Sequence, residues 1–189
     1  MTFTPYKPLS VAFIGGALNS AVGYTHFNAS RLDGHFRVDA GCFSRHDEQN
    51  ELTAKVYGIS PERCYSDQQT LFKQEKGQVD ALVILTPTPS HAEIVTAALE
   101  AGYPVICEKA LATSADECLQ IENAVKANHG YLAVTYNYSG YPMVRELRGM
   151  ISEGRFGTPQ QIQIEMPQEG FLRLNANTQD WRRKDYAVP

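Results

Sequence analysis

One stretch near the start of the chain, residues 11–23, restricts the possible folds more than any other. It reads Val-Ala-Phe-Ile-Gly-Gly-Ala-Leu-Asn-Ser-Ala-Val-Gly, so four apolar residues lead directly into paired glycines. An unbroken apolar run of this kind is typical of a buried parallel strand. When a glycine turn joins such a strand to a helix, free N–H groups lie at the positive end of the helix dipole. The stretch therefore predicts a pyrophosphate-binding turn.

The glycine pattern departs from G-x-G-x-x-G, the pattern expected of a dinucleotide-binding turn. Gly15, Gly16 and Gly23 are present, whereas Ala17 and Asn19 stand where a richer loop would carry more glycine. Asn tolerates a left-handed backbone better than most residues, and Ala adds only a methyl group. By spacing alone, a dinucleotide site and a strand–turn–helix that binds nothing are equally good interpretations.

The overall composition is that of a globular protein with a substantial core. The chain has 189 residues, of which 43% are hydrophobic and 20% are charged, and its formal net charge is −4. This charge gives no basic surface for nucleic acid or an anionic membrane. We find no segment of membrane-spanning length, and the first ten residues lack the apolar core of a signal peptide. We therefore expect a cytoplasmic protein without a nucleic-acid or membrane partner.

The cysteines, Cys42, Cys64, Cys107 and Cys118, show no C-x-x-C pairing. Two of them fall in segments that we expect to be buried strands. We interpret them as small core side chains in a reducing compartment, and we expect neither a disulfide framework nor a metal site.

Expected strands and helices alternate along most of the chain. After the first strand we expect strands at 36–43, 79–85, 104–107 and 131–136, and helices at 20–32, 47–57, 70–76, 90–100 and 114–128. Ser114 and Glu117 are spaced as a capping box at the start of the last of these helices. This alternation predicts an α/β fold with a doubly wound parallel sheet of Rossmann type, which we assign to residues 1–140.

The ends of the expected strands carry the first candidates for a binding site, because ligands of doubly wound sheets bind beyond the carboxyl ends of the strands. Each pair of residues there has an ordinary structural explanation, and Glu-Lys, for example, is most often a solvated surface pair. Taken together, these five pairs contain more polar residues and glycines than a sheet without a binding site requires. They are Gly15-Gly16, Ser44-Arg45, Thr86-Pro87, Glu108-Lys109 and Asn137-Tyr138.

The order of these motifs resembles the Gfo/Idh/MocA oxidoreductases, a family named for glucose–fructose oxidoreductase and inositol dehydrogenase. The resemblance runs from about Ser10 to Trp181 and implies an NAD(P)-dependent oxidoreductase that acts on a sugar, polyol or related hydroxyl compound. Its features are the glycine turn, Thr86-Pro87 with His91 four residues further on, Ala98-Leu99-Glu100-Ala101-Gly102, Cys107-Glu108-Lys109-Ala110-Leu111-Ala112 and Tyr136-Asn137-Tyr138-Ser139-Gly140-Tyr141-Pro142.

The resemblance implies which residues bind the cofactor. The glycine turn would hold the pyrophosphate, and the loop after the third strand would border the nicotinamide. The residues concerned are Gly15, Gly16, Asn19 and Gly23 with Ser20 beside them at the turn, and Thr86, Pro87 and His91 at the nicotinamide side.

The resemblance also assigns the catalytic candidate, Lys109. Glu108-Lys109 matches the start of the family's Glu-Lys-Pro motif, and we include both residues among the cofactor-binding candidates. The lysine of this motif hydrogen-bonds the reacting oxygen and assists its proton transfer while hydride passes to or from the nicotinamide. Here Ala110 replaces the proline, and a cis peptide without proline costs roughly 2.5–4 kcal/mol. We therefore expect a trans Lys109–Ala110 peptide and a shifted Lys109.

The choice between NAD and NADP depends on the end of the second strand. NAD-specific sites place an acidic residue there for the ribose hydroxyls, whereas a 2′-phosphate favours arginine and a small donor. This chain has Ser44-Arg45, and Asp39 lies too early, inside the expected strand. Arg45 is also explained as a solvated residue before the next helix. The residues favour NADP(H) slightly.

The chain after Tyr141 resembles only the opening of the family's second domain. We expect a helix at 142–153 and one strand at 160–166, which make residues 141–189 the start of a truncated substrate and dimerisation domain. The family's Asp-x-x-x-His motif, whose histidine commonly transfers the proton, has no counterpart here. We expect residues from about Pro167 onward to be poorly ordered or held by a partner chain.

Three classes of function remain open from the sequence. The first is an oxidoreductase with a small sugar-like substrate, represented here by an inactive fragment that keeps its nucleotide site. The second keeps the cofactor but breaks glycosidic bonds without net oxidation, as some relatives do. The third is a nucleotide-binding module without catalysis. The sequence also leaves open whether the protein forms a homo-oligomer.

Overall fold

The computed structural model describes residues 7–167. The chain divides into two compact units, residues 1–135 and residues 136–189. Because their relative position is not determined, each unit is described by itself.

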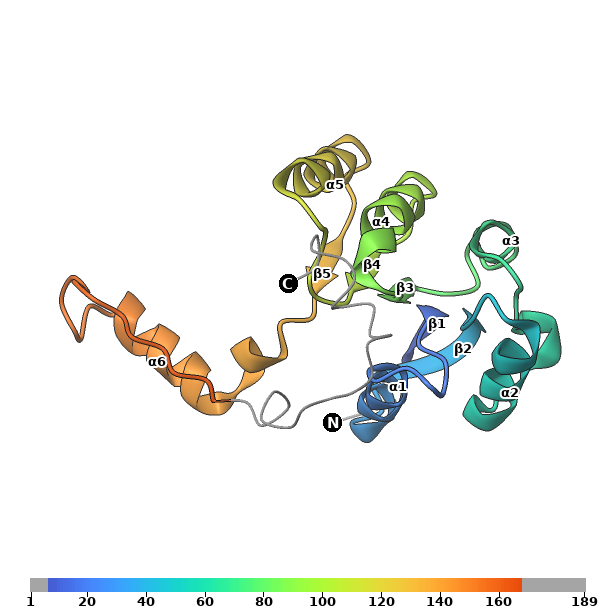
Figure 1. The fold of residues 1–189 in the computed structure, drawn as a ribbon, viewed down its shortest axis with the longest axis horizontal. Coiled ribbons are helices and arrows are strands. Elements are labelled where there is room, and N and C mark those ends of the chain that lie inside the picture. The colour runs from blue at the N-terminus through green and yellow to red at the C-terminus, as the bar shows by residue number, and fades with distance from the viewer. Residues whose placement is uncertain (1–6, 168–189) are drawn as a thin grey trace, which may run out of the picture. The chain divides into compact units, whose positions relative to one another are not determined.

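The first unit is built on a five-stranded parallel sheet in the order β2-β1-β3-β4-β5 (Figure 1). The chain crosses from one half of the sheet to the other between β1 and β3, which is the switch point at which ligands bind in such sheets. The strands are β1 Leu9–Gly15, β2 Phe36–Cys42, β3 Ala81–Leu85, β4 Val105–Cys107 and β5 Leu132–Val134. The predicted doubly wound sheet is confirmed.

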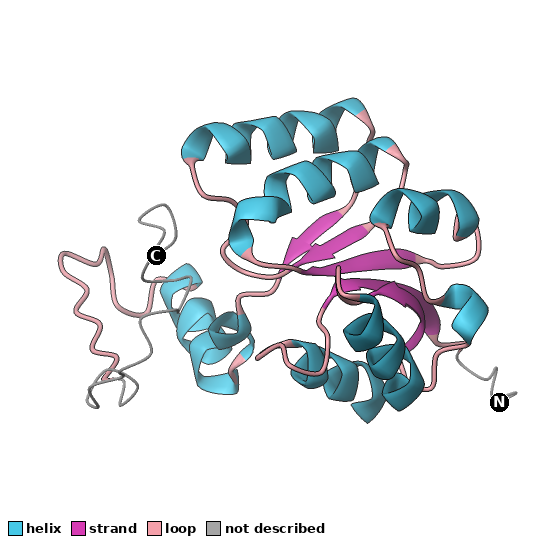
Figure 2. Ribbon diagram, turned by 45° about the vertical axis from the view of Figure 1, so that its right-hand side comes forward, coloured by secondary structure: helices cyan, strands magenta, loops and turns pink. Residues whose placement is uncertain are grey.

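Helices cover both faces of this sheet, as Figure 2 shows. Two helices lie on one face and three on the other. The first pair is α1 Gly23–Leu32 and α2 Asp47–Tyr57, and the second group is α3 Gln68–Gln74, α4 His91–Glu100 and α5 Ala115–Ala127. Two short 3-10 turns, Pro61–Arg63 and Thr88–Ser90, lie between them.

Side-chain alternation along the strands divides the core into two clusters. In β1, Val11 and Phe13 point to the cluster under α1 and α2, whereas Ala12 and Ile14 point to the cluster under α3, α4 and α5. A strand covered on both faces is apolar throughout. β3 is buried over its whole length for this reason.

Local signals set most helix ends. Gly58 ends α2 in a left-handed conformation, and the carboxylate of Asp67 accepts a hydrogen bond from the Thr70 N–H at the start of α3. The predicted cap of α5 is confirmed, because the Ser114 hydroxyl accepts from the N–H of Glu117 at 3.2 Å. The Glu117 carboxylate turns back to the N–H of Thr113, one residue before the expected partner.

The outer edge of β2 is partly covered by a later segment. Cys64 forms a parallel bridge with Gly41, and the N–H of Tyr65 donates to the Gly41 carbonyl at 2.8 Å. This bridge stands where the third strand of a Rossmann sheet lies. A buried ion pair supports the segment, because Arg63 and Tyr65 both bond the carboxylate of Glu75, which is 1% exposed.

The second unit contains a 3-10 turn, Asn137–Gly140, and one helix, α6 Pro142–Ser152. The side chains of Met143, Val144, Leu147 and Ile151 give α6 an apolar face, and this face is exposed. The expected strand at 160–166 is wrong, because residues 158–167 pair with no neighbouring strand. Alternation alone cannot make a strand without a partner for its backbone hydrogen bonds. The expectation of poor order after Pro167 lies outside the described residues.

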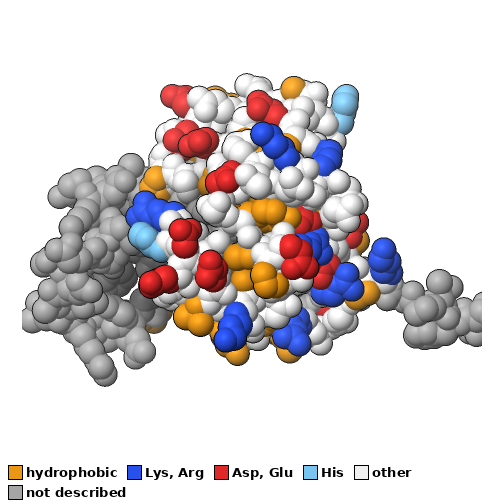
Figure 3. All heavy atoms as spheres, turned by 90° about the vertical axis from the view of Figure 1, so that its right-hand side faces the viewer, with side chains coloured by type: hydrophobic (Ala, Val, Ile, Leu, Met, Phe, Trp, Pro, Cys, Tyr) orange, Lys and Arg blue, Asp and Glu red, His pale blue; other side chains and the backbone are white. Residues whose placement is uncertain are grey.

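The surface seen from the side of α2 and α3 carries acidic and basic side chains with apolar side chains among them (Figure 3). Among residues 7–167, no helix is long and apolar enough to cross a membrane. The cysteines are free thiols, of which Cys107 is buried and Cys118 exposed.

Candidate functional site

The glycine turn after β1 has no room for side chains. Gly15 and Gly16 have φ angles of 80° and 76°, which are left-handed conformations that favour glycine. A Cβ on Gly15 would lie 2.8 Å from backbone atoms of Leu85 and Thr86, and one on Gly23 would lie 2.1 Å from the Gly16 carbonyl oxygen. The missing side chains therefore let the turn pack against β3 and let α1 start directly against the turn.

Two side chains of helix α2 form hydrogen bonds with the backbone of this turn. The hydroxyl of Tyr57 donates to the Gly16 carbonyl at 3.2 Å, and Thr53, one helical turn earlier, accepts from the N–H of Leu18. The Tyr57 ring stacks on Phe27 with centroids 4.0 Å apart. Because C=O and N–H point in opposite directions across a trans peptide, the N–H that follows Gly16 faces away from Tyr57. In the sequence, only the four-residue spacing of Thr53 and Tyr57 indicated that both lie on the same face of this helix.

Helix α1 begins at Gly23, three residues later than expected. The N–H of Ser20 donates to the Ala17 carbonyl at 2.7 Å, so residues 17–20 form a separate turn. The Ser20 hydroxyl then accepts from the N–H groups of Val22 and Gly23. Ser20 therefore orders the entry to the helix, and Asn19 lies exposed on the loop before it. The first turn of α1 retains N–H groups without intrahelical partners, as an anion site requires.

The end of β2 presents Ser44 and Arg45 as the sequence suggested. The Ser44 hydroxyl accepts from the N–H of His46 at 3.1 Å, and Arg45 is exposed and has no hydrogen bond or ion pair within residues 7–167. Asp39 lies inside β2, as expected, and bonds Arg37 and Ser10. Burial raises the pKa of Asp39, but these hydrogen bonds outweigh burial and lower it overall.

His91 ties together the loops that follow β3 and β4. Its ring is fully buried, and its two nitrogens lie 2.7 Å from the carbonyl oxygens of Thr86 and Ala110. The loop itself remains accessible, since Thr86 is half-buried and Pro87 is exposed. His91 can thus position both loops at the edge of the site.

The carboxylate of Glu108 is bonded from three directions at the end of β4. Its Oε1 lies 2.8 Å from His26 Nε2 and accepts from Thr135 Oγ1 at 2.7 Å, and its Oε2 accepts from the N–H of Lys109. Burial raises the pKa of Glu108, but the hydrogen bonds from His26 and Thr135 outweigh burial and lower it overall. Glu108 is therefore held as a carboxylate, and the side chain of Lys109 is exposed beside it.

The expected trans peptide between Lys109 and Ala110 is wrong, because this peptide is cis. The expectation considered only the local cost of the isomer. One contact across the fold lies beside this peptide: the Ala110 carbonyl oxygen is 2.7 Å from Nδ1 of the buried His91.

Strand register brings these candidates to one edge. Gly15 is paired with Leu85, so the glycine turn lies next to Thr86, and Ile84 is paired with Cys107, so Glu108 follows on the next strand. Ser44 and Arg45 end β2 on the other side of β1. Gly15, Thr86 and Glu108 thus border the switch point. The glycines let α1 start close to the end of β1, and the N–H groups of its first turn are donors that suit a pyrophosphate.

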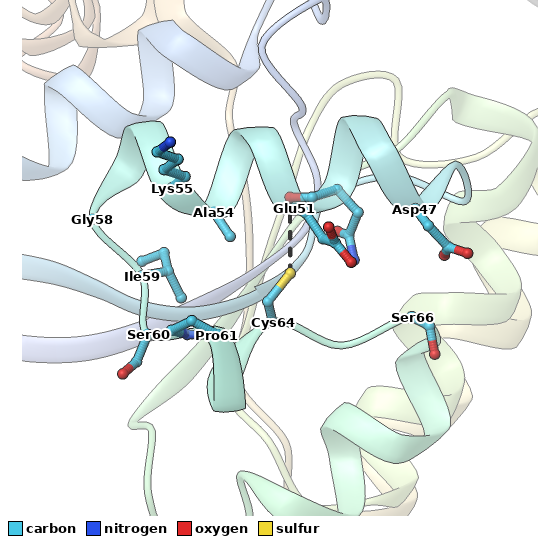
Figure 4. Close-up of a pocket in the computed structure, with 11 residues that line it drawn as sticks. Asp47, Glu51, Ala54, Lys55, Gly58, Ile59, Ser60, Pro61, Cys64 and Ser66 are labelled. Atoms are coloured by element: carbon cyan, nitrogen blue, oxygen red, sulfur yellow. Dashed lines mark hydrogen bonds between the residues drawn. The ribbon is translucent and has the colours of Figure 1, made fainter.

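A groove of about 730 Å³ lies elsewhere, between α2 and the segment 58–66 (Figure 4). Asp47, Glu51, Lys55 and Cys64 are among its lining residues, and the Cys64 thiol contacts the Asn50 carbonyl. None of the site candidates lines this groove. Within residues 7–167 no cluster of His, Cys, Asp and Glu could hold a metal ion.

The sheet order and the glycine turn at the switch point define a Rossmann-type dinucleotide-binding domain. Residues 9–136 match the family described as "Oxidoreductase family, NAD-binding Rossmann fold". The chain therefore belongs to the Gfo/Idh/MocA family of NAD-binding oxidoreductases, as the sequence motifs indicated.

Several relatives are similar over part of their length. The uncharacterized oxidoreductase YfiI of Bacillus subtilis is 36% identical over 185 residues, which are 93% of this chain and 47% of YfiI. Inositol 2-dehydrogenase of Azotobacter vinelandii is 35% identical over 59% of this chain and 32% of that protein. The chain spans about half the length, or less, of these curated relatives.

A solved structure has the same fold. The crystal structure of an inositol dehydrogenase homolog from Azotobacter vinelandii, complexed with NADH and myo-inositol, is 36% identical and superposes with a TM-score of 0.75. The match covers 80% of this chain and 41% of that one.

Proposed function

We propose that this chain forms the cofactor-binding part of an NAD(P)-dependent oxidoreductase that acts on a sugar or polyol. The observation that carries the proposal is the position of Gly15, Gly16 and Gly23 at the same edge of the sheet as Glu108-Lys109, with β3 between them. The substrate class is supported by relatives named inositol 2-dehydrogenase and by the solved relative complexed with myo-inositol.

The proposed roles follow from the chemistry of each group. When bound, the dinucleotide supplies a nicotinamide that accepts or donates hydride. The glycine turn and the first turn of α1 would bind its pyrophosphate through N–H groups. Lys109 would donate a hydrogen bond to the substrate oxygen and carry its proton, and Glu108 would hold the Lys109 backbone through its N–H.

The first experiment is a calorimetric titration of the 189-residue chain with NADH and with NADPH. Micromolar binding of either is expected, because the turn is preformed. If neither binds, the proposed nucleotide site is wrong. A parallel assay with NAD+ and myo-inositol tests catalysis, for which we expect little or no turnover. A rate ordinary for a dehydrogenase would contradict that expectation.

We further propose a slight preference for NADPH, supported by the exposed Arg45 and the neighbouring hydroxyl of Ser44. Replacing Arg45→Ala should weaken NADPH binding roughly tenfold and leave NADH binding within about twofold, since only NADPH carries the 2′-phosphate. Lys55→Ala, on the far part of α2, is the matched control for loss of a positive charge. If Arg45→Ala leaves the ratio of the dissociation constants for NADPH and NADH unchanged, the proposed preference for NADPH is wrong.

Residues 141–189 are proposed to open a substrate and dimerisation domain. The exposed apolar face of α6 supports this proposal, because such a face is normally covered. A nucleotide-binding module without catalysis is the second candidate, and it is supported by the position of the glycine turn and its bordering loops within residues 1–135. Measuring binding without turnover in the assay above would support it.

We also propose that the protein is cytoplasmic and forms a homo-oligomer. Cell fractionation tests the location, and light scattering tests the oligomeric state.

A further inference from the structure

Two residues outside every sequence motif, His26 and Thr135, converge on the carboxylate of Glu108. His26 comes from α1 and Thr135 from the end of β5. His26 Nε2 and Thr135 Oγ1 lie 2.8 Å and 2.7 Å from the same oxygen, Oε1. The side chains of His26 and Glu108 are only 19% and 12% exposed. An ionised carboxylate only accepts hydrogen bonds, so His26 donates from Nε2.

These contacts determine how the other carboxylate oxygen is used. Glu108 Oε2 accepts from the backbone N–H of Lys109 at 3.1 Å. Because Oε1 is held by two donors, the carboxylate cannot rotate without breaking them. The backbone of Lys109 is therefore anchored through Glu108, and hydrogen bonds to a charged group are about twice as strong as neutral ones.

Helix α1 connects this network to the glycine turn. α1 starts at Gly23, whose Cα lies against Gly16, and the N–H of His26 donates to the Val22 carbonyl at 2.9 Å. The first turn of α1 therefore contacts the glycine turn at one end and Glu108 at the other.

We propose that His26 is a positioning residue, which couples the dinucleotide turn to the backbone of Lys109 through the carboxylate of Glu108. A role of this coupling in catalysis rests on the proposed function. The hydrogen-bond network itself can be tested on the 189-residue chain without any ligand.

The first test is amide hydrogen exchange at Lys109, measured by NMR in the wild-type chain, His26→Leu and His26→Gln. Removing the donor should free the carboxylate, so Lys109 should exchange roughly 2- to 10-fold faster in His26→Leu. The side-chain amide of the glutamine variant can donate to Glu108, so His26→Gln should restore most of the protection.

The neighbouring amide of Glu108 is the internal control, because it donates to the Ile84 carbonyl within the sheet and should not change. His129→Asn, which alters an exposed histidine after α5 whose φ of 48° asparagine tolerates, is the control for loss of an imidazole. Unchanged exchange at Lys109 in His26→Leu would overturn the proposal. Equal acceleration at Glu108 would also overturn it, since His26 would then only support the fold.

The second test compares NADH with ADP-ribose, which lacks the nicotinamide. If His26 acts through Glu108 and Lys109, His26→Leu should weaken NADH binding about fivefold or more and ADP-ribose binding less than about twofold. Equal losses would overturn the coupling, because they would place the effect on the glycine turn alone. A wild-type chain that binds neither ligand would refute the proposed function, and the exchange experiment would still decide the role of His26.

Discussion

At the scale of single residues, the glycines of the turn differ in what surrounds their missing side chains. Gly15 and Gly16 need a left-handed backbone, whereas Gly23 lies in a helix and needs only space. The clash would be closest at Gly23, because a Cβ there would lie 2.1 Å from the Gly16 carbonyl oxygen. That oxygen belongs to the backbone, so it can move only if the turn moves with it. The third glycine of the pattern is thus a packing requirement.

Replacing Gly23→Ala should therefore push α1 away from the turn. We expect the free energy of unfolding to fall by about 1–3 kcal/mol and dinucleotide binding to be lost, as is usual for overpacking. Chemical denaturation and calorimetric titration measure the two effects. Gly149→Ala in α6, where an added Cβ meets nothing within 4 Å, is the matched control and should not weaken binding. Tight binding by Gly23→Ala would contradict this account of the turn.

The ionisation of Glu108 gives a prediction about pH. Its folded-state pKa lies below the ordinary value of 4.5, so the carboxylate stabilises the fold above that pH and loses its effect as pH falls through the folded-state pKa. Glu108→Gln should cost about 1–2 kcal/mol near neutral pH and progressively less below pH 4.5. Denaturation of both chains between pH 7 and pH 3 tests this. A constant difference over that range would show that ionisation is not involved.

At the scale of elements, the segment between α2 and β3 depends on one buried ion pair. The sequence predicts the neighbouring helices but not that Arg63 and Tyr65 would meet Glu75. Burial and the hydrogen bond to Glu75 raise the pKa of Tyr65 to about 12, so its hydroxyl remains a donor at all ordinary pH values. The pair holds in place the segment that covers the outer edge of β2.

Removing the arginine should leave a carboxylate that is buried with only one partner. We expect Arg63→Ala to lower the free energy of unfolding by about 3 kcal/mol, measured by chemical denaturation. Lys126→Ala removes a cation whose pair with Glu122 is exposed, and it should change stability by less than about 0.5 kcal/mol. Similar small effects of both substitutions would mean that the buried pair does not anchor this segment.

At the scale of the whole molecule, the candidate site lies within residues 1–135. The glycine turn, the loop after β3 and the Glu108 network are all formed by that unit. The second unit contributes an amphipathic helix whose apolar face is exposed. Cofactor binding is therefore expected to depend on residues 1–135, which also contain the catalytic candidate Lys109.

A chain ending at Thr135 should accordingly bind NADH or NADPH with a Kd within about threefold of the 189-residue chain, because no described hydrogen bond of the site is lost. A chain ending at Ala127 removes β5 and Thr135 and is the matched control, which should bind at least about tenfold more weakly. Equal titration curves for the two shortened chains would contradict the role given to β5 and Thr135.

Local signals in the sequence were enough to predict the alternation of helices and strands, the parallel sheet and the position of the glycine turn. These follow from apolar runs, caps and glycines that act within a few residues of each other, such as the cap formed by Ser114 on α5. The motifs also led to Glu108, Lys109 and His91 and to the family.

The way these residues are held depends on contacts between distant parts of the chain. The contacts of Tyr57 with Gly16 and of His26 with Glu108 join positions 41 and 82 residues apart, and no local pattern encodes such pairs. The cis peptide at Lys109 and the missing strand at 160–166 were mispredicted for the same reason. Beside the Lys109–Ala110 peptide, the Ala110 carbonyl contacts His91, which lies 19 residues earlier. Residues 160–166 have no neighbouring strand within the described part of the chain.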